Sequence, residues 1–152
     1  MLDHPGIVAG RRVLDLGAGS GVVAIAAARA GASEVTAADV DRYAIAAIRL
    51  NAAANGVAVR AHLGDLTGGP PPDVDLLLVG DLFYAEDLAL RVGAFLGRCL
   101  EARIEILVAD PWRSFLPRER LRLVAEYPGV DFAERAPVKG RTNAVFAFAA
   151  EA

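Results

Sequence analysis

A glycine-rich loop preceded by an acidic residue is the first feature of the sequence able to carry chemistry. The run Asp15-Leu16-Gly17-Ala18-Gly19-Ser20-Gly21 follows a short apolar segment and precedes a helical pattern. Glycines between a strand and a helix let the backbone turn tightly and approach a ligand. Val22 stands where the dinucleotide fingerprint has its third glycine, and the Asp15 carboxylate would repel a pyrophosphate. The loop therefore favours a cationic ligand over a dinucleotide.

Two further carboxylates extend this loop into a predicted nucleoside site. Asp39 closes the second apolar run, eighteen residues after Gly21, near the place where a ribose-binding acid is expected. Asp65 closes the third run, where its side chain can accept a hydrogen bond from an adenine amine. The alternative is that Asp39 and Asp65 are only turn residues, but their shared place after consecutive strands favours the nucleoside site. S-adenosylmethionine, a nucleoside with an ammonium and a sulfonium, fits both features.

The residues around these acids resemble a known family. The stretch Val13–Gly21 is similar to motif I of the class I S-adenosylmethionine-dependent methyltransferases, and Val35-Thr36-Ala37-Ala38-Asp39 is similar to their second motif. Gly80-Asp81-Leu82-Phe83-Tyr84 resembles the Asp-x-x-Tyr/Phe motif of the seven-β-strand protein-lysine methyltransferases. The predicted cofactor contacts are Asp15, Gly17, Ala18, Gly19, Gly21, Asp39, Val40, Asp65, Leu66 and Asp81.

A narrower resemblance lies in the second half of the chain. Asp110-Pro111-Trp112-Arg113, followed by Phe115-Leu116-Pro117, is similar to the branch that methylates lysines of the electron transfer flavoprotein β-subunit. The ending Val138–Val145 is similar to the last hairpin of that branch. Members of the branch usually carry a further segment before motif I, whereas motif I begins here twelve residues after Met1. The resemblance therefore implies an N-terminally shortened relative.

The resemblance implies methyl transfer from S-adenosylmethionine to a lysine amine of a flavoprotein β-subunit-like protein, with S-adenosylhomocysteine as product. We expect Asp81 to orient the amine and to take its proton directly or through water. Orientation is the safer role, because a nearby carboxylate stabilises the ammonium form. Tyr84 is the second catalytic candidate, with its ring toward the amine.

Substrate contacts are predicted at Phe83, Trp112 and Arg113. The alternative for Phe83 and Tyr84 is a place in the core at the start of a helix; we favour that alternative for Phe83, and it stays open for Tyr84. The alternative for Trp112 and Arg113 is a structural loop with a solvated guanidinium.

Other functions stay open at this stage. The enzyme could methylate a small molecule or another protein, or the chain could bind S-adenosylmethionine without turnover. An adenine DNA methylase is disfavoured, because Gly80-Asp81-Leu82-Phe83 replaces the usual Asn/Asp-Pro-Pro-Tyr motif. A nicotinamide oxidoreductase is disfavoured by the loop spacing and by Asp15.

Strands that alternate with helices must position these residues. Apolar runs predict strands at 13–16, 35–38, 57–63, 74–79, 104–109, 130–136 and 144–149. Helices are expected after Ser20 and after Asp41, both as N-caps, and over the stripe from Leu88 to Cys99; a short helix is expected after Pro117, carrying Leu121 and Val124. This order predicts an α/β fold in one domain over 1–152. Its Rossmann-like, mostly parallel, seven-stranded sheet has helices on both faces and an antiparallel last strand.

The composition narrows the function classes. The chain has 152 residues, of which 55% are hydrophobic, enough to fill a core. The net charge of −3 and the scattered basic residues argue against nucleic-acid binding. The single cysteine, Cys99, excludes a disulfide within the chain and a cysteine zinc site, and we expect it to be buried. No metal cluster, membrane span or signal peptide is apparent, so we expect a metal-free cytoplasmic enzyme with a protein partner.

Overall fold

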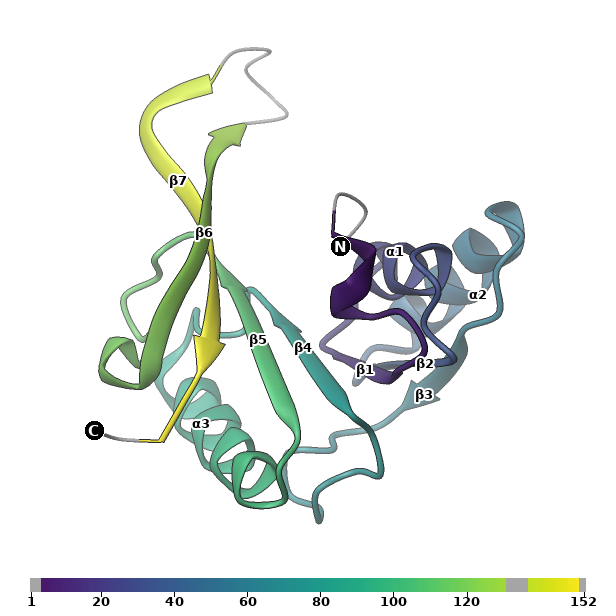
Figure 1. The fold of residues 1–152 in the computed structure, drawn as a ribbon, viewed down its shortest axis with the longest axis horizontal. Helices are drawn as coiled ribbons and strands as arrows, with labels where there is room; N and C mark the ends of the chain where they lie inside the picture. The colour runs from purple at the N-terminus through teal and green to yellow at the C-terminus, as the bar shows by residue number, and fades with distance from the viewer. Residues whose placement is uncertain (1–3, 131–136, 151–152) are drawn as a thin grey trace.

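The sheet and its helices are described by the computed structural model for residues 4–130 and 137–150 (Figure 1). The strands are β1 (Arg12–Leu16), β2 (Glu34–Asp39), β3 (Arg60–Leu63), β4 (Leu76–Gly80), β5 (Glu105–Asp110), β6 (Leu121–Val130) and β7 (Pro137–Phe148). The α-helices are α1 (Val22–Arg29), α2 (Arg42–Ala54) and α3 (Glu86–Glu101), and the 3-10 helices are η1 (Pro5–Ile7) and η2 (Arg118–Arg120).

The seven strands form one sheet in the order β3-β2-β1-β4-β5-β7-β6. Strands β1 to β5 are mutually parallel, and β7 runs antiparallel to both of its neighbours. Strands β2 and β3 are added on one side of β1, and β4 is added on its other side. The order of strands across the sheet therefore reverses between β3 and β4. The predicted mostly parallel sheet with an antiparallel last strand is confirmed.

Alternate residues of the central strands pack against different helices. In β1, Leu14 and Leu16 belong to the core beneath α3, together with its Phe95. Val13 belongs instead to a second core formed with α1 and α2, which contains Ile48. Because successive strand residues point to opposite faces, this division places helices on both faces of the sheet, as predicted. Cys99 is buried in the core under α3, which confirms the expectation for the thiol.

The ends of the helices show which capping predictions hold. Asp41 caps α2, because its Oδ1 accepts a hydrogen bond of 2.8 Å from the backbone N–H of Tyr43. The predicted cap of α1 is wrong: Gly21, with φ 81°, occupies the N-cap position in place of Ser20. A side chain on Gly21 would have its Cβ 3.1 Å from Ile48 of α2. Close contact between α1 and α2 thus requires glycine at this turn.

Loss of the α2 cap is expected to destabilise the chain modestly. Asp41→Ala removes the acceptor for the Tyr43 N–H and should lower the free energy of unfolding by about 1 kcal/mol. Chemical denaturation measures this change. Glu101→Ala, at the exposed end of α3, is the matched control and should change stability by less than about 0.5 kcal/mol. Equal stability of the two variants would show that the cap contributes nothing.

The segment after Pro117 differs from the prediction. In place of a helix carrying Leu121 and Val124, a single 3-10 turn leads directly into β6, which contains both residues. Pairing with β7 explains the outcome, since Leu121 lies opposite Phe148. A register shift between Leu123 and Ala125 interrupts the alternation of the strand, and this is why its sequence lacks a period of two.

The last two strands are also placed differently from the prediction. The strand expected at 130–136 lies outside the described residues except for Val130, which is the last residue of β6. Strand β7 begins at Pro137, seven residues before the expected start, and continues to Phe148.

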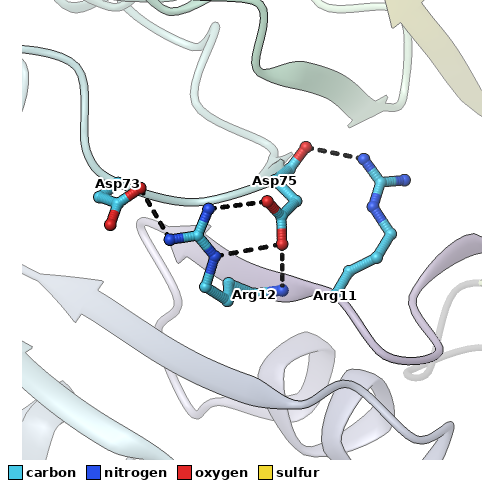
Figure 2. Close-up of polar contacts among 4 residues, drawn as sticks. All are labelled: Arg11, Arg12, Asp73 and Asp75. Atoms are coloured by element: carbon cyan, nitrogen blue, oxygen red, sulfur yellow. Dashed lines mark hydrogen bonds and ion pairs between the residues drawn. The ribbon is translucent and has the colours of Figure 1, made fainter.

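A polar cluster ties the amino ends of β1 and β4 together (Figure 2). The Arg12 guanidinium contacts Asp73 at 2.7 Å and Asp75 at 2.8 Å, and Arg11 donates to the backbone oxygen of Asp75 at 2.7 Å. The pairing with Arg12 lowers the pKa of Asp75 to about 2. This cluster lies at the end of the sheet opposite to the carboxyl ends of the parallel strands, so it holds the fold and leaves the ligand edge free.

Candidate functional site

A cleft of about 590 Å³ opens at the carboxyl ends of β1 to β4. Ligands of open α/β sheets bind at this edge, where the order of the strands reverses. The cleft brings together residues far apart in the sequence, from Leu16 at the end of β1 to Val92 in α3. Its lining residues are Leu16, Gly17, Ala38, Asp39, Val40, Gly64, Asp65, Leu66, Thr67, Gly80, Asp81, Leu82, Tyr84, Ala85, Asp87, Leu88, Arg91 and Val92.

The glycine loop turns beneath one wall of this cleft. The N–H groups of Gly17 and Ala18 both donate to the carbonyl oxygen of Ala38, at 2.9 and 3.0 Å. Gly17 has φ 69°, and a Cβ on it would lie 2.6 Å from the side chain of Leu82. The residue after β1 must therefore be glycine for the loop to pass this closely under the residues that follow β4.

Asp39 connects the glycine loop to the end of β2. Its Oδ2 accepts from the N–H of Gly19 at 2.8 Å, and its Oδ1 accepts from the N–H of Asp41 at 2.9 Å. Both oxygens keep unused lone pairs, and the residue lines the cleft with its neighbour Val40. The structure thus brings Asp39 and Val40 to the predicted side of the loop, with Asp39 oriented for further acceptor contacts.

Asp65 lies on the opposite wall of the cleft, next to Leu66. Its Oδ1 accepts from the hydroxyl of Thr67 at 2.6 Å and from the backbone N–H of the same residue at 2.8 Å, while Arg91 approaches Oδ2 at 3.4 Å. The hydroxyl contact is the largest of several causes that lower the pKa of Asp65. The side chain is an ionised acceptor in a fixed orientation.

Asp15 lies below the loop and not on the surface of the cleft. The side chain shares a face of the sheet with Val13, is only 2% exposed, and accepts from the N–H of Ala24 in α1 at 3.0 Å. Burial, aided by the charge of Asp39, raises the pKa of Asp15 to about 7, although the Ala24 N–H opposes this shift. A carboxyl with this pKa responds to any cation placed above the loop. Its predicted contact with a cofactor stays a prediction.

Asp81 and Arg113 form an ion pair at the mouth of the cleft. Arg113 Nη2 lies 2.7 Å from Asp81 Oδ2, and Arg113 Nε also donates to Oδ1. The hydrogen bond to Asp81 is the main cause that raises the pKa of Arg113. Asp81 and Trp112, which follow the ends of β4 and β5, have positive φ values of 56° and 65°. Arg113 is thus paired with the predicted catalytic acid, whereas the sequence left it as a substrate contact or a solvated group.

The aromatic residues after β4 separate into a core residue and a surface residue. Phe83 is fully buried in the core under α3, so the prediction that it contacts a substrate is wrong and the core alternative is confirmed. Tyr84 is 59% exposed and lines the cleft, with the Arg113 guanidinium 6.0 Å from its ring centroid. The core alternative for Tyr84 is therefore wrong. Trp112 packs edge-on against Phe146 with ring centroids 4.9 Å apart, which favours its structural alternative.

Asp110 is a second buried carboxyl, and it contacts the backbone of the ion pair formed by Asp81 and Arg113. Asp110 ends β5, is 2% exposed, and accepts from the N–H of Arg113 through Oδ1 at 2.6 Å. Within the described part of the chain its Oδ2 has no hydrogen-bond partner. Burial is the largest cause that raises the pKa of Asp110. The Asp110 bond fixes the backbone from which the Arg113 side chain extends.

Several cleft residues were absent from the sequence-based prediction. Leu82 packs over Gly17, and Asp87 and Arg91 reach the cleft from the first turns of α3. The contact between Arg91 and Asp65 closes one side of the cleft. Asp87 and Arg91 could have been predicted from the sequence, because the helix that begins shortly after Tyr84 must present its first turns to the edge of the sheet where β4 ends.

Neither a membrane-spanning helix nor a metal-binding cluster occurs in residues 4–130 and 137–150 of the chain. No helix there is long and apolar enough to cross a membrane. In the same residues, His, Cys, Asp and Glu side chains do not gather into a group of three able to hold a metal ion.

Comparison with known proteins gives a family and several relatives. Residues 2–78 match the family model of the ribosomal protein L11 methyltransferase (PrmA). The electron transfer flavoprotein beta subunit lysine methyltransferase of Rattus norvegicus is 42% identical over 115 residues, which make up 74% of this chain and 45% of the rat protein. The chain spans about half the length of the flavoprotein-directed relatives it matches.

Solved structures are similar over nearly the whole chain. The ribosomal protein L11 methylase of Lactobacillus delbrueckii subsp. bulgaricus superposes with a TM-score of 0.67 at 20% identity, covering 97% of this chain and 74% of that one. The tRNA (uracil-54, C5)-methyltransferase of Pyrococcus abyssi, in complex with S-adenosyl-L-homocysteine, gives a TM-score of 0.68 at 18% identity, covering 96% of this chain and 36% of that one. At these identities the likeness establishes the fold.

Proposed function

Because the chain belongs to the PrmA family, within the class I S-adenosylmethionine-dependent methyltransferases, we propose that it transfers a methyl group from S-adenosylmethionine to the side-chain amine of a protein lysine. The observation that carries this proposal is the carboxylate of Asp81 at the mouth of the cleft, beside the exposed ring of Tyr84. An acid and an aromatic face together suit a cationic or amine-bearing side chain.

The residues of the cleft fit the cofactor. Asp39 can accept from both ribose hydroxyls, Val40 and Leu66 offer apolar contact to the adenine, and Asp65 can accept from the adenine amine. Gly17 permits the close approach that a side chain would block. The acids near the loop, including buried Asp15, suit a positively charged methionine group. When bound, S-adenosylmethionine supplies a methyl group on a sulfonium, which is already a good leaving group.

The protein's own contribution is alignment of the amine and exclusion of water. Asp81 accepts a hydrogen bond from the amine and so directs the nitrogen lone pair along the transfer axis. The amine has a reference pKa near 10.4 in its ammonium form, so it must lose a proton before it attacks. We assign that proton to solvent or to Asp81 through water, with orientation as the main role of the carboxylate.

Among protein substrates, we favour one like the β-subunit of the electron transfer flavoprotein. The similarity to the rat enzyme extends over 115 residues, whereas the PrmA match ends at residue 78, three residues before Asp81. The PrmA match therefore supports the cofactor half of the site and leaves the acceptor half to the longer similarity. Ribosomal protein L11 is the second candidate, supported by the family match itself.

Methyl transfer to defined proteins tests the proposal. The purified chain is incubated with tritiated S-adenosylmethionine and, in parallel, with the flavoprotein β-subunit, L11 or a free lysine derivative, and peptide mass spectrometry locates the added mass. We expect label on lysine of the β-subunit. Label on L11 alone would replace the favoured substrate by the second candidate, and label on the free amine alone would contradict a protein substrate.

Cofactor binding separates an inactive enzyme from a failed assignment. Calorimetry with S-adenosylmethionine should show binding by the wild-type chain and about 10- to 100-fold weaker binding by Asp39→Ala, which loses a charged acceptor for the ribose. Binding without transfer to any acceptor would favour a binding module. Absence of binding would contradict the proposal altogether.

A further inference from the structure

The ion pair between Arg113 and Asp81 bears directly on how the acceptor amine becomes reactive. A lone carboxylate next to a lysine amine stabilises the ammonium form, which cannot attack a methyl group. In this structure the Asp81 carboxylate is not alone, because Arg113 Nη2 lies 2.7 Å from Oδ2 while Nε donates to Oδ1. The amine would therefore meet an acceptor whose charge is already balanced.

On this geometry we propose that Arg113 is a positioning residue that neutralises Asp81, so that the carboxylate holds the acceptor amine by hydrogen bonding without stabilising its ammonium form. This inference rests on the proposed function. Each carboxylate oxygen has further lone pairs beyond those used by the guanidinium. Asp81 can therefore accept from Arg113 and from a neutral amine together.

The position of Arg113 is fixed by its backbone as well as by its side chain. Its N–H donates to Asp110 Oδ1 at 2.6 Å, and Asp110 is buried at the end of β5. The Asp81 N–H in turn donates to the carbonyl oxygen of Ala109 at 2.9 Å. Neighbouring ends of β4 and β5 thus hold the acid and the guanidinium next to each other.

The exposure of the pair favours a role in the site over a role in stability. The side chains of Arg113 and Asp81 are 39% and 52% exposed, and an ion pair this open adds little to the stability of the fold. The same exposure leaves Asp81 within reach of an incoming side chain. The Arg113 guanidinium also lies 6.0 Å from the ring centroid of Tyr84, so a carboxylate, an aromatic ring and a cation lie together at one corner of the cleft.

Other charged and titratable groups surround this corner and must be considered in any pH profile. They are Asp110 at the end of β5, Asp39 at the end of β2, Asp65 after β3, Tyr84 after β4, and Asp87 and Arg91 on α3. Of these, Asp110 is held on the backbone of Arg113, and Arg91 is engaged with Asp65. Arg113 is the cation that contacts both oxygens of Asp81.

The pH dependence of methyl transfer tests the inference. Single-turnover rates at saturating cofactor and protein substrate are measured between pH 6.5 and 10 for the wild type, Arg113→Met and Arg113→Lys. We expect the midpoint of the rise in rate to move up by about one pH unit in Arg113→Met, which makes it about tenfold slower at neutral pH and nearly wild-type at high pH. Arg113→Lys should restore most of the wild-type midpoint, because it keeps the charge.

A control variant and the cofactor affinity distinguish a role of Arg113 in the reaction from a structural role. Tyr84→Phe keeps the aromatic face and leaves the pair between Arg113 and Asp81 in place, so it should keep the wild-type midpoint. A midpoint that moves as far as in Arg113→Met would overturn the inference. A uniform loss of rate in Arg113→Met with an unchanged midpoint would overturn the inference in favour of a structural role. A lower KM and a faster rate in Arg113→Met would overturn it by making Arg113 a competitor of the substrate. Cofactor affinity, measured by calorimetry, should be the same in the wild type, Arg113→Met and Arg113→Lys, because Arg113 does not line the cleft.

The failure of the proposed function is distinguishable from the failure of this inference. A wild-type chain that methylates no lysine contradicts the proposed function, and the inference falls with it. A wild-type chain that is active, but shares its pH midpoint with Arg113→Met, contradicts the inference alone.

Discussion

Replacement of Asp81 by asparagine is expected to slow methyl transfer by about 100- to 1,000-fold, in the lower part of the range for loss of a positioned acid–base group, because orientation is the main role of this carboxylate. Asparagine keeps the shape of the side chain but presents one acceptor oxygen in place of two. Its amide N–H₂ would face the N–H groups of Arg113 that now donate to the carboxylate. The amine would lose its oriented acceptor, and the guanidinium would lose its partner.

Single-turnover kinetics with the methylated lysine as readout measure this effect. Cofactor affinity of Asp81→Asn should stay within about tenfold of the wild type, because the ribose, adenine and glycine-loop contacts come from other strands. Asp73→Asn is the matched control: it removes a carboxylate at the opposite end of the sheet (Figure 2) and should keep full activity. Wild-type turnover by Asp81→Asn would remove Asp81 from the mechanism.

The buried carboxyl of Asp15 is expected to make stability depend on pH. Its pKa is about 7 in the folded chain, against an ordinary value of 3.8. The folded state therefore binds this proton more tightly than the unfolded state does. The stabilising contribution is complete below about pH 4, is lost as pH rises through about 7, and changes no further above that. About three pH units at about 1.4 kcal/mol each set an upper limit of about 4 kcal/mol.

Thermal and chemical unfolding of wild type and Asp15→Asn across pH 4 to 8 measure this contribution. Asparagine can still accept from the Ala24 N–H, but it does not titrate. The fall in stability between pH 4 and pH 7 should therefore be much smaller in the variant than in the wild type. Equal slopes in the two proteins would show that Asp15 does not titrate in this range.

Cofactor binding adds a second readout for Asp15. A cation above the loop favours the ionised carboxyl, so binding of S-adenosylmethionine near pH 7 should release a proton from the wild type and not from Asp15→Asn. Calorimetry in buffers with different ionisation enthalpies detects that proton. Identical proton release by both proteins would place the cation too far from Asp15 to act on it.

The caps of α1 and α2 show which features a local sequence pattern can predict and which it cannot. Asp41 caps α2 as predicted, because the signal of an Asx cap is contained within three residues. The cap of α1 was misassigned to Ser20, since the requirement for Gly21 comes from the close approach of Ile48 on another helix. Contacts across the fold cannot be read from a local pattern.

The predictions for the C-terminal strands were wrong for a related reason. Leu121 and Val124 are spaced as on a helix, yet both lie in β6. The register shift between Leu123 and Ala125 breaks the alternation that identifies a strand. The pairing with β7, and not the propensity of the segment, decided its conformation.

The sequence by itself determined the order of strands and helices as far as β5, the glycine loop, and the placement of Asp39, Asp65 and Asp81 at one edge of the sheet. These follow from short-range patterns and from the rule that parallel strands end at the same edge. Only the tertiary structure decided that Phe83 is buried, that Asp15 lies beneath the loop, and that Arg113 pairs with Asp81. Burial and ion pairing join residues from separate strands, so their energies depend on distances that no single segment of the chain contains.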